Sequence, residues 1–194
     1  MICFTLVAGN SAHQKKKQPE INEELFIRIG NDDKSALEEL FLLSERAVHA
    51  MTLSILKDPY NAQDAVQETF MKIREVSHLY RPNGKPLAWI LTIAKNISLN
   101  FLRKTSRETP SQDCVPEDDL RFSCVSDPTD RLVLSTALNI LSEDERQIIL
   151  LHVVSGVKHM EIAKALQLPL STVLSRYHRA LKKLKKHLVG RGEF

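Results

Sequence analysis

The segment from Glu161 to Leu181, EIAKALQLPLSTVLSRYHRAL, has the pattern of a short helix, a turn and a longer basic helix. Hydroxyl and guanidinium groups at the start of such a second helix can hydrogen-bond to base edges in a major groove. An Arg paired with guanine contributes about 1–3 kcal/mol of discrimination between bases. The side chains on this polar face are Ser171, Thr172, Ser175, Arg176 and Arg179. They predict recognition of DNA by a helix-turn-helix.

The opposite face of the same segment is apolar and predicts a core. It comprises Ile162, Ala163, Leu166, Leu168, Val173, Tyr177, Leu181 and Leu184. An ordinary helical hairpin with a basic exposed face is the alternative interpretation. His178 and His187 lie nine residues apart beside lysines, so we expect surface side chains there and no metal site.

Charge is segregated along the chain, although the formal net charge of its 194 residues is only +3. Residues 20–70 carry 4 Lys or Arg and 11 Asp or Glu, whereas residues 71–107 carry 8 and 1. Residues 108–130 carry 1 and 7, and residues 155–194 carry 9 and 2. Clustered cations bind nucleic acids by releasing counterions, so the two basic blocks predict two surfaces that meet a polyanion. Solvated helix faces are the alternative.

Composition and periodicity predict an all-α fold, because glycine is scarce and aromatic residues make up only 6% of the chain. Two helices are expected in residues 20–56, separated at Asn31-Asp32-Asp33. After Asp58-Pro59, Asn61 is expected to cap a helix that reaches about Ser77. A loop precedes a fourth helix, from Leu87 to about Lys104. Residues 20–106 are therefore predicted to form a four-helix domain.

A second domain is predicted in residues 128–189. Ser142 and Glu145 have the spacing of a capping box, and Gly156 is expected to end the helix that they begin. The next helix is predicted at His159–Leu166, and Ser171 is expected to cap the last helix, which runs to about Leu188. The fold class is thus all-α, with two small helical domains.

The remaining segments are predicted to carry no fold. Residues 107–127 are acidic and proline-containing and predict a flexible linker. Residues 1–19 are expected to be a disordered extension, and residues 190–194 a tail. The apolar start of the chain is too short to span a bilayer and precedes its lysines, so we expect neither a signal peptide nor membrane insertion.

Cys3, Cys114 and Cys124 are an odd number of thiols without a CxxC pair. They predict neither a disulfide framework nor a zinc site, and they suit a reducing cytoplasm. We find no glycine-rich phosphate loop and no carboxylate or histidine cluster suited to a metal, so no cofactor and no catalytic site are expected.

Three motifs, in order, resemble the extracytoplasmic-function (ECF) sigma factors of the sigma-70 family. DPYNAQDAVQETFMKIRE resembles the core-binding stretch of region 2, and PLAWILTIAKNISLNFLRK resembles the promoter-melting helix that follows it. The segment from Leu141 to Leu184 resembles region 4 almost throughout. The resemblance covers roughly residues 21–188 and implies a promoter-specificity subunit of RNA polymerase, located in the cytoplasm.

The resemblance also implies roles for individual residues. Asp64, Gln67 and Glu68 would contact the clamp helices of the largest polymerase subunit, while Phe70 packs in the core. The −10 element would be read by Lys95, Asn96, Asn100, Arg103 and Lys104, with an unstacked base captured by the loop YRPNGKP. The −35 element would be read by Ser171, Thr172, Leu174, Ser175, Arg176, His178 and Arg179. An anti-sigma factor, in many cases anchored in a membrane, is a further implied partner.

Two positions depart from the family pattern. Asn100 stands where Asp is common, which keeps a hydrogen-bonding side chain but changes the preferred base. Leu174 stands where a basic residue often reaches the −35 element; it could lie in the core or touch a thymine methyl group.

Two other functions remain as alternatives. A stand-alone helix-turn-helix regulator would explain the C-terminal helices, but it would leave the basic helix from Lys95 to Lys104 without a role. A recombinase or nuclease would need a nucleophile or a metal site, which Ser98, Ser106 and the acidic linker do not provide.

Overall fold

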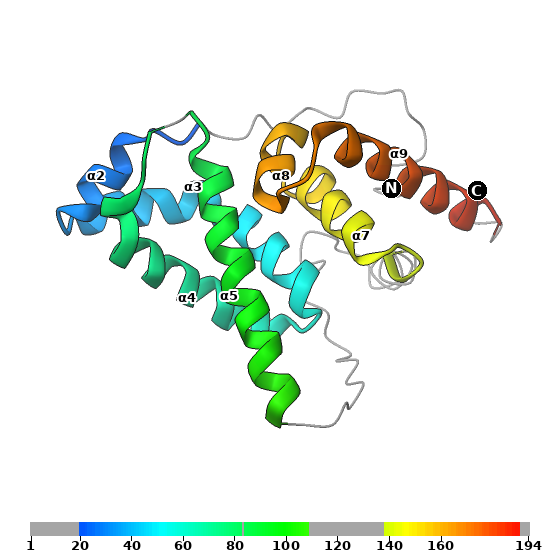
Figure 1. Cartoon of the computed structure of the whole chain (residues 1–194), viewed down its shortest axis with the longest axis horizontal. Helices are drawn as coiled ribbons and strands as arrows, with labels where there is room; N and C mark the ends of the chain where they lie inside the picture. Colours follow the sequence, from blue (N-terminus) through cyan, green and yellow to red (C-terminus); the bar gives the residue numbers. More distant parts are fainter. Residues whose placement is uncertain (1–19, 83, 109–137, 191–194) are drawn as a thin grey trace.

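The computed structural model describes residues 20–82, 84–108 and 138–190, and all regular structure in these residues is helical (Figure 1). The predicted N-terminal extension, residues 109–127 of the linker and the first ten residues of the predicted second domain lie outside the described part. The three cysteines lie outside it as well.

Four α-helices and one short 3₁₀ turn form an N-terminal group. They are α2 (Glu24–Gly30), α3 (Lys34–Leu56), α4 (Pro59–Val76), the turn η1 (Ser77–Leu79) and α5 (Pro86–Glu108). The four predicted helices are present. The last helix runs four residues further than expected, so that residues 107 and 108, expected in the linker, are helical.

Side-chain caps explain where two of these helices begin. Asp33 accepts hydrogen bonds from the backbone N–H groups of Ser35 and Ala36, at 3.0 and 3.3 Å, which starts α3. In α4 the cap is Asp58, whose carboxylate accepts from the N–H of Asn61 at 2.7 Å. The prediction that Asn61 is the cap was wrong, because Pro59 fits the first helical position, where no N–H is needed.

The C-terminal group consists of α7 (Glu143–Ile149), a π-helical continuation η3 (Leu150–Val154), α8 (His159–Leu166) and α9 (Leu170–Gly190). The capping box is confirmed: Ser142 N–H donates to Glu145 at 3.0 Å, and Glu145 N–H donates to the Ser142 hydroxyl at 3.4 Å. Gly156 follows the end of η3 with a φ of 73°, a backbone conformation that favours glycine.

Helix α9 begins earlier than expected. Thr172 and Val173 both donate their N–H groups to the carbonyl of Pro169, at 3.0 and 3.2 Å. Ser171 therefore lies in the first turn of α9, and the prediction that it caps the helix was wrong. The turn that precedes α9 follows Gln167, whose φ of 58° reverses the chain direction.

The two groups pack directly against each other, and one apolar core runs through both. Helices α3 and α5 of the first group contact α7, η3 and α8 of the second, and we call this contact the seam. Met51 of α3, Leu91 of α5, Ile148 of α7 and Ile162 of α8 are all fully buried in the same cluster. Burial of such side chains stabilises a fold by about 1.5–3 kcal/mol each.

Polar contacts flank the apolar part of the seam. The Gln147 amide donates to the Ser54 hydroxyl at 3.2 Å, and the Lys57 ammonium donates to Glu143 at 2.7 Å. The hydrogen bond and the positive charge of Lys57 hold the pKa of Glu143 below its ordinary value. These pairs add polar contacts between the two groups at the edge of their apolar core.

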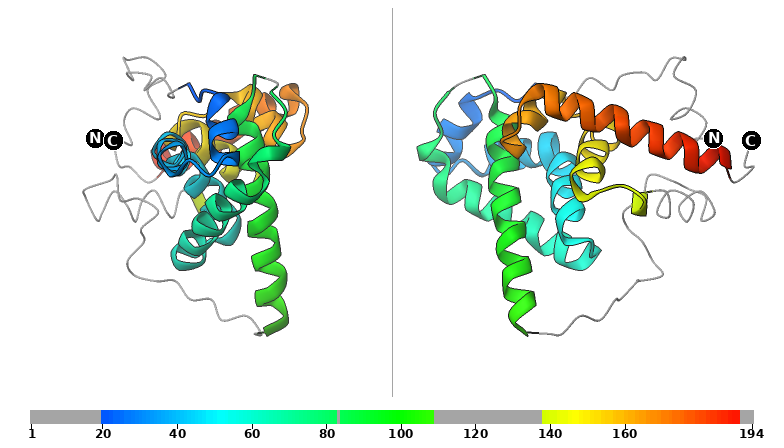
Figure 2. Two further views of the ribbon diagram at one scale, coloured as in Figure 1. Left: turned by 90° about the vertical axis from the view of Figure 1, so that its left-hand side faces the viewer. Right: turned by 45° about the vertical axis from the view of Figure 1, so that its right-hand side comes forward.

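The C-terminal halves of α5 and α9 project beyond the rest of the molecule (Figures 1 and 2). Both projecting segments are basic, and Arg103, Lys104, Lys182 and Lys186 are exposed on them. None of the described helices is both long and apolar enough to cross a lipid bilayer.

Candidate polymerase and nucleic-acid interfaces

The exposed face of α4 carries the three side chains predicted to bind polymerase. Asp64, Gln67 and Glu68 are all exposed, and within the described residues none of them forms a hydrogen bond or an ion pair. Their neighbours Val66 and Phe70 are buried, at 3% and 6% exposure, and the predicted core position of Phe70 is confirmed. The face is acidic and is available to a basic protein surface.

Two large apolar side chains flank this face, and the sequence analysis did not single them out. Tyr60 is 69% exposed and precedes Asp64 by one helical turn, while Met71 is 73% exposed and follows Gln67 by one turn. Aromatic and methionine side chains are enriched in protein interfaces. The detectable signal was their spacing of four from the polar residues, which places them on the same face.

The exposed face of α5 brings together four of the five residues predicted to read the −10 element. Asn96, Asn100, Arg103 and Lys104 are exposed and follow one another at spacings of four, three and one residues. Lys95 lies apart, half-buried, with its Nζ 3.4 Å from the carbonyl oxygen of Leu166 at the end of α8. Its ammonium is therefore held at the seam.

The loop before α5 is anchored by an aromatic cluster. Tyr80 is buried and stacks on Phe26 of α2 with ring centroids 4.1 Å apart, and Trp89 meets both rings edge-on at 5.3 and 5.2 Å. Arg81 and Pro82 of this loop are exposed. The aromatic rings hold the base of the loop and are not presented to a nucleobase.

On α9 the predicted −35 residues share one outward surface, with two exceptions. Ser171, Leu174, Ser175, His178 and Arg179 are exposed, whereas Thr172 and Arg176 are half-buried. The Arg176 guanidinium is ion-paired with Asp144 of α7 at 2.7 Å. Leu174 is 36% exposed, so of its two predicted positions the structure places it outside the core.

Two histidines and a tyrosine gather behind this surface. The rings of His152 and His159 lie 3.8 Å apart, and Tyr177 meets them edge-on at 5.1 and 4.7 Å. His152 donates from Nδ1 to the carbonyl of Val157 at 2.8 Å. Burial, followed by the charges of His152 and His178, lowers the pKa of His159 to about 4. The imidazole of His159 is thus neutral at physiological pH.

His187 differs from its expected surface position. It is half-buried, and its Nε2 is buried without a hydrogen-bond partner among the described residues. Within the described ranges, no group of three or more His, Cys, Asp or Glu side chains could hold a metal ion.

A helix-turn-helix made by α8 and α9, beside a second exposed basic helix, is typical of helical DNA-binding proteins. Residues 40–108 match the family model of sigma-70 region 2, and residues 131–184 match that of sigma-70 region 4, so that together the models cover well over half of the chain. The chain belongs to the sigma-70 family of RNA polymerase sigma factors, in the ECF group.

Curated relatives match over nearly their full length. The RNA polymerase sigma-H factor of Pseudomonas aeruginosa is 26% identical over 182 residues, covering 87% of this chain and 94% of its own. The ECF sigma factor SigX of Bacillus subtilis is 28% identical, covering 78% and 85%. SigK of Mycobacterium tuberculosis is 25% identical, covering 86% and 92%.

Two solved structures share the fold. CnrH, in complex with the cytosolic domain of CnrY, has a TM-score of 0.65 at 20% identity and covers 88% of this chain and 98% of its own. The sigma factor RpoE of Bartonella quintana, in complex with the anti-sigma factor NepR, has a TM-score of 0.61 at 25% identity and covers 79% and 96%. The predicted all-α sigma fold is confirmed.

Proposed function

We propose that this protein binds core RNA polymerase and directs promoter-specific initiation of transcription by reading −10 and −35 elements and assisting DNA melting. The observation that carries this proposal is the presence of sigma-70 regions 2 and 4 in one chain, each with a helix that exposes side chains predicted to contact DNA. The chain therefore contains both of the regions that are needed to contact a promoter at two separate elements.

The polymerase contact is proposed on α4. Asp64, Gln67 and Glu68 would meet the clamp helices of the largest subunit, with Tyr60 and Met71 as apolar anchors at the two ends of the face. The supporting observation is a face that combines unpaired acidic groups with large exposed apolar groups. Large apolar side chains that lose their contact with water on binding contribute much of the free energy of association.

Promoter contacts are proposed on α5 and α9. Asn96 and Asn100 would read bases of the −10 element, while Arg103 and Lys104 would neutralise phosphates. On α9, Arg176 and Arg179 would read or position the −35 element, and the exposed Leu174 would meet a thymine methyl group. Lys95 and Arg176 can join these contacts only after leaving Leu166 and Asp144.

The partner and the compartment follow from the same proposal. Both solved structures are complexes with a second protein: CnrH with the cytosolic domain of CnrY, and RpoE with the anti-sigma factor NepR. We infer that an anti-sigma factor, anchored in a membrane as the family resemblance implies, regulates this chain in the cytoplasm. The polymerase supplies the phosphodiester chemistry, so the sigma factor itself has no catalytic role.

The test is reconstituted transcription. Purified protein is mixed with core RNA polymerase and a library of promoter fragments, and the transcript start sites are sequenced. A sigma factor gives starts that share two upstream elements and depend on added protein. Tight binding to duplex DNA without core polymerase, together with no directed initiation, would instead identify a stand-alone regulator.

A further inference from the structure

Glu23, immediately before α2, contacts the loop that leads into the proposed −10 helix. Its Oε1 accepts a hydrogen bond from the backbone N–H of Gly84 at 2.9 Å and another from the Tyr80 hydroxyl. Glu23 precedes these residues by 61 and 57 positions in the sequence. One carboxylate oxygen thus joins the two ends of the exposed turn that contains Arg81 and Pro82.

The contact suits a carboxylate because two donors converge on one oxygen atom. Hydrogen bonds to a charged acceptor are about twice as strong as neutral ones. Gly84 has a φ of 70°, and a Cβ at this position would meet no atom within 4 Å. The left-handed conformation, and not lack of space, is what favours glycine there, and it directs the Gly84 N–H toward Glu23.

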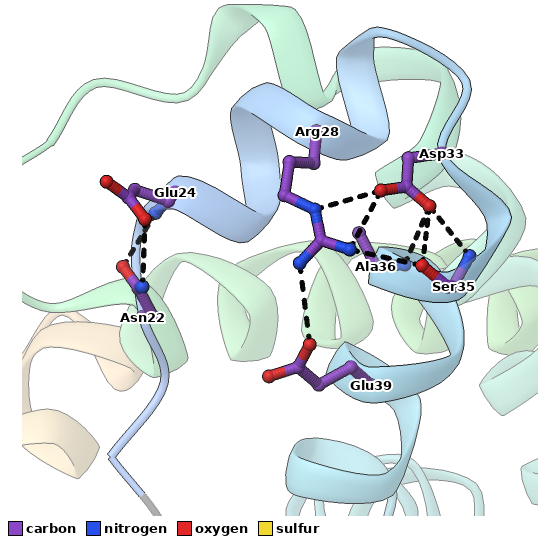
Figure 3. A network of polar contacts seen from close by, with 7 residues as sticks. All are labelled: Asn22, Glu24, Arg28, Asp33, Ser35, Ala36 and Glu39. Carbon is purple, nitrogen blue, oxygen red and sulfur yellow. Dashed lines mark hydrogen bonds and ion pairs between the residues drawn. The ribbon is translucent and has the colours of Figure 1, made fainter.

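Helix α2 is fixed independently of Glu23. Arg28 donates to Asp33 at 2.9 Å and to Ser35 at 3.1 Å, and lies 3.6 Å from Glu39 of α3 (Figure 3). Phe26 is 1% exposed and packs against both Tyr80 and Trp89. Glu23 is therefore held at a defined place even though it lies at the end of a short helix.

We propose that Glu23 is a positioning residue that sets the shape of this loop and thereby the base selectivity of promoter opening. The inference rests on the proposed function, together with the expectation from the family resemblance that this loop receives an unstacked base of the −10 element. Without the Glu23 carboxylate, Tyr80 remains stacked in the core, but the Gly84 N–H and the Tyr80 hydroxyl lose their common acceptor. The loop then samples several shapes, and the captured base is no longer distinguished from the others.

The experiment measures base selectivity in the intact holoenzyme. Four fluorescent promoter fragments carry a pre-opened −10 region and differ only in the base at the captured position, and their affinities are measured for each sigma variant. The variants are Glu23→Ala, Glu23→Gln, which retains an amide oxygen as acceptor, and Tyr80→Phe, which removes only the hydroxyl. Glu24→Ala is the matched control, because Glu24 contacts Asn22 and not the loop.

Wild-type protein is expected to separate the best and worst bases by about tenfold or more. Glu23→Ala should reduce this ratio to about twofold, Glu23→Gln should recover part of it, and Tyr80→Phe should lie between Glu23→Ala and wild type. Polymerase affinity and −35 duplex binding should stay within about twofold of wild type in all variants.

The inference is overturned if Glu23→Ala keeps the wild-type ratio, or if it weakens all four fragments equally, as a general loss of folding would. If Glu23→Ala does not fold, Tyr80→Phe decides by the same criterion. A wild-type protein that forms no holoenzyme, or shows no selectivity at any −10 position, would overturn the proposed function itself.

Discussion

The Arg176 guanidinium of α9 and the Asp144 carboxylate of α7 form an ion pair, with Nη1 and Oδ2 2.7 Å apart. Asp144 is about half exposed and Arg176 is 25% exposed, so the pair sits at the edge of the proposed DNA surface. In the free protein the Asp144 carboxylate is thus paired with the guanidinium that we propose binds a base or a phosphate.

Asp144→Asn should therefore raise the affinity of the protein for a −35 duplex. Exposed ion pairs contribute about 0–1 kcal/mol, which corresponds to an increase of up to about fivefold. Arg176→Ala should weaken the same binding by about 1–3 kcal/mol if Arg176 pairs with guanine. Fluorescence anisotropy at one salt concentration measures both. Glu38→Gln, an equal change of charge on the exposed face of α3, should have little effect, and a lower affinity of Asp144→Asn would contradict the competition.

Glu68→Ala should reduce holoenzyme formation without changing DNA preference. An exposed interface charge acts mainly on the association rate, so a several-fold reduction is expected at low salt and a smaller one at high salt. Surface plasmon resonance with immobilised core polymerase measures the rate, and Glu38→Ala is the control. An unchanged polymerase affinity would remove Glu68 from the interface.

Tyr60→Ala and Met71→Ala should weaken polymerase binding more strongly than Glu68→Ala. Large apolar anchors that become desolvated in an interface cost more than about 1 kcal/mol when truncated, mainly by faster dissociation. Leu42→Ala, an equally exposed apolar residue on α3, is the control, at 78% exposure. Equal dissociation rates for all three variants would place the interface elsewhere.

Stability should decrease as the pH falls from about 6.5 toward about 4, in part because of His159. Its pKa in the folded protein is about 4, lowered first by burial and then by the neighbouring histidines, against about 6.5 in the unfolded chain. The unfolded state thus binds more protons in this window, which favours unfolding. Urea unfolding at several pH values should show a shallower dependence for His159→Gln than for wild type. An unchanged dependence would show that His159 titrates alike in both states.

Leu151→Ala should lower the free energy of unfolding by about 2–5 kcal/mol, because Leu151 is fully buried in the core that crosses the seam. Urea denaturation followed by circular dichroism measures the change, and Leu42→Ala should stay within about 0.5 kcal/mol of wild type. A loss below about 1 kcal/mol for Leu151→Ala would mean that the seam is open in solution.

Local sequence signals predicted the helices well where each signal acts within a few residues. The Ser142–Glu145 capping box, the bounds of His159–Leu166 and the buried face of α9 all follow from short-range spacing. The two wrong caps, Asn61 and Ser171, arose because Asp58 and the Pro169 carbonyl supply acceptors earlier in the chain. A choice between neighbouring acceptors depends on backbone geometry, which composition does not determine.

Contacts between distant segments were beyond the sequence analysis. Nothing in the spacing of Lys95 or Arg176 indicated that Leu166 and Asp144 would hold them, and nothing linked Glu23 to Gly84. These pairs depend on how the two helix groups pack and on how α2 lies against α5. Exposure, by contrast, followed the helical period, so the outward faces of α4, α5 and α9 were largely predictable.

Because the two helix groups share one core, each group competes with any partner that binds the buried surface of the other. Any partner that holds the groups apart must offset the exposure of apolar side chains such as Met51 and Ile148, which are 0% exposed in the packed state. The measured affinity of such a partner then equals its intrinsic affinity multiplied by the fraction of molecules that are already open. A substitution inside the seam, remote from every partner contact, would change the fraction of open molecules. It would change the affinity for such a partner, and with it promoter use, by the same factor.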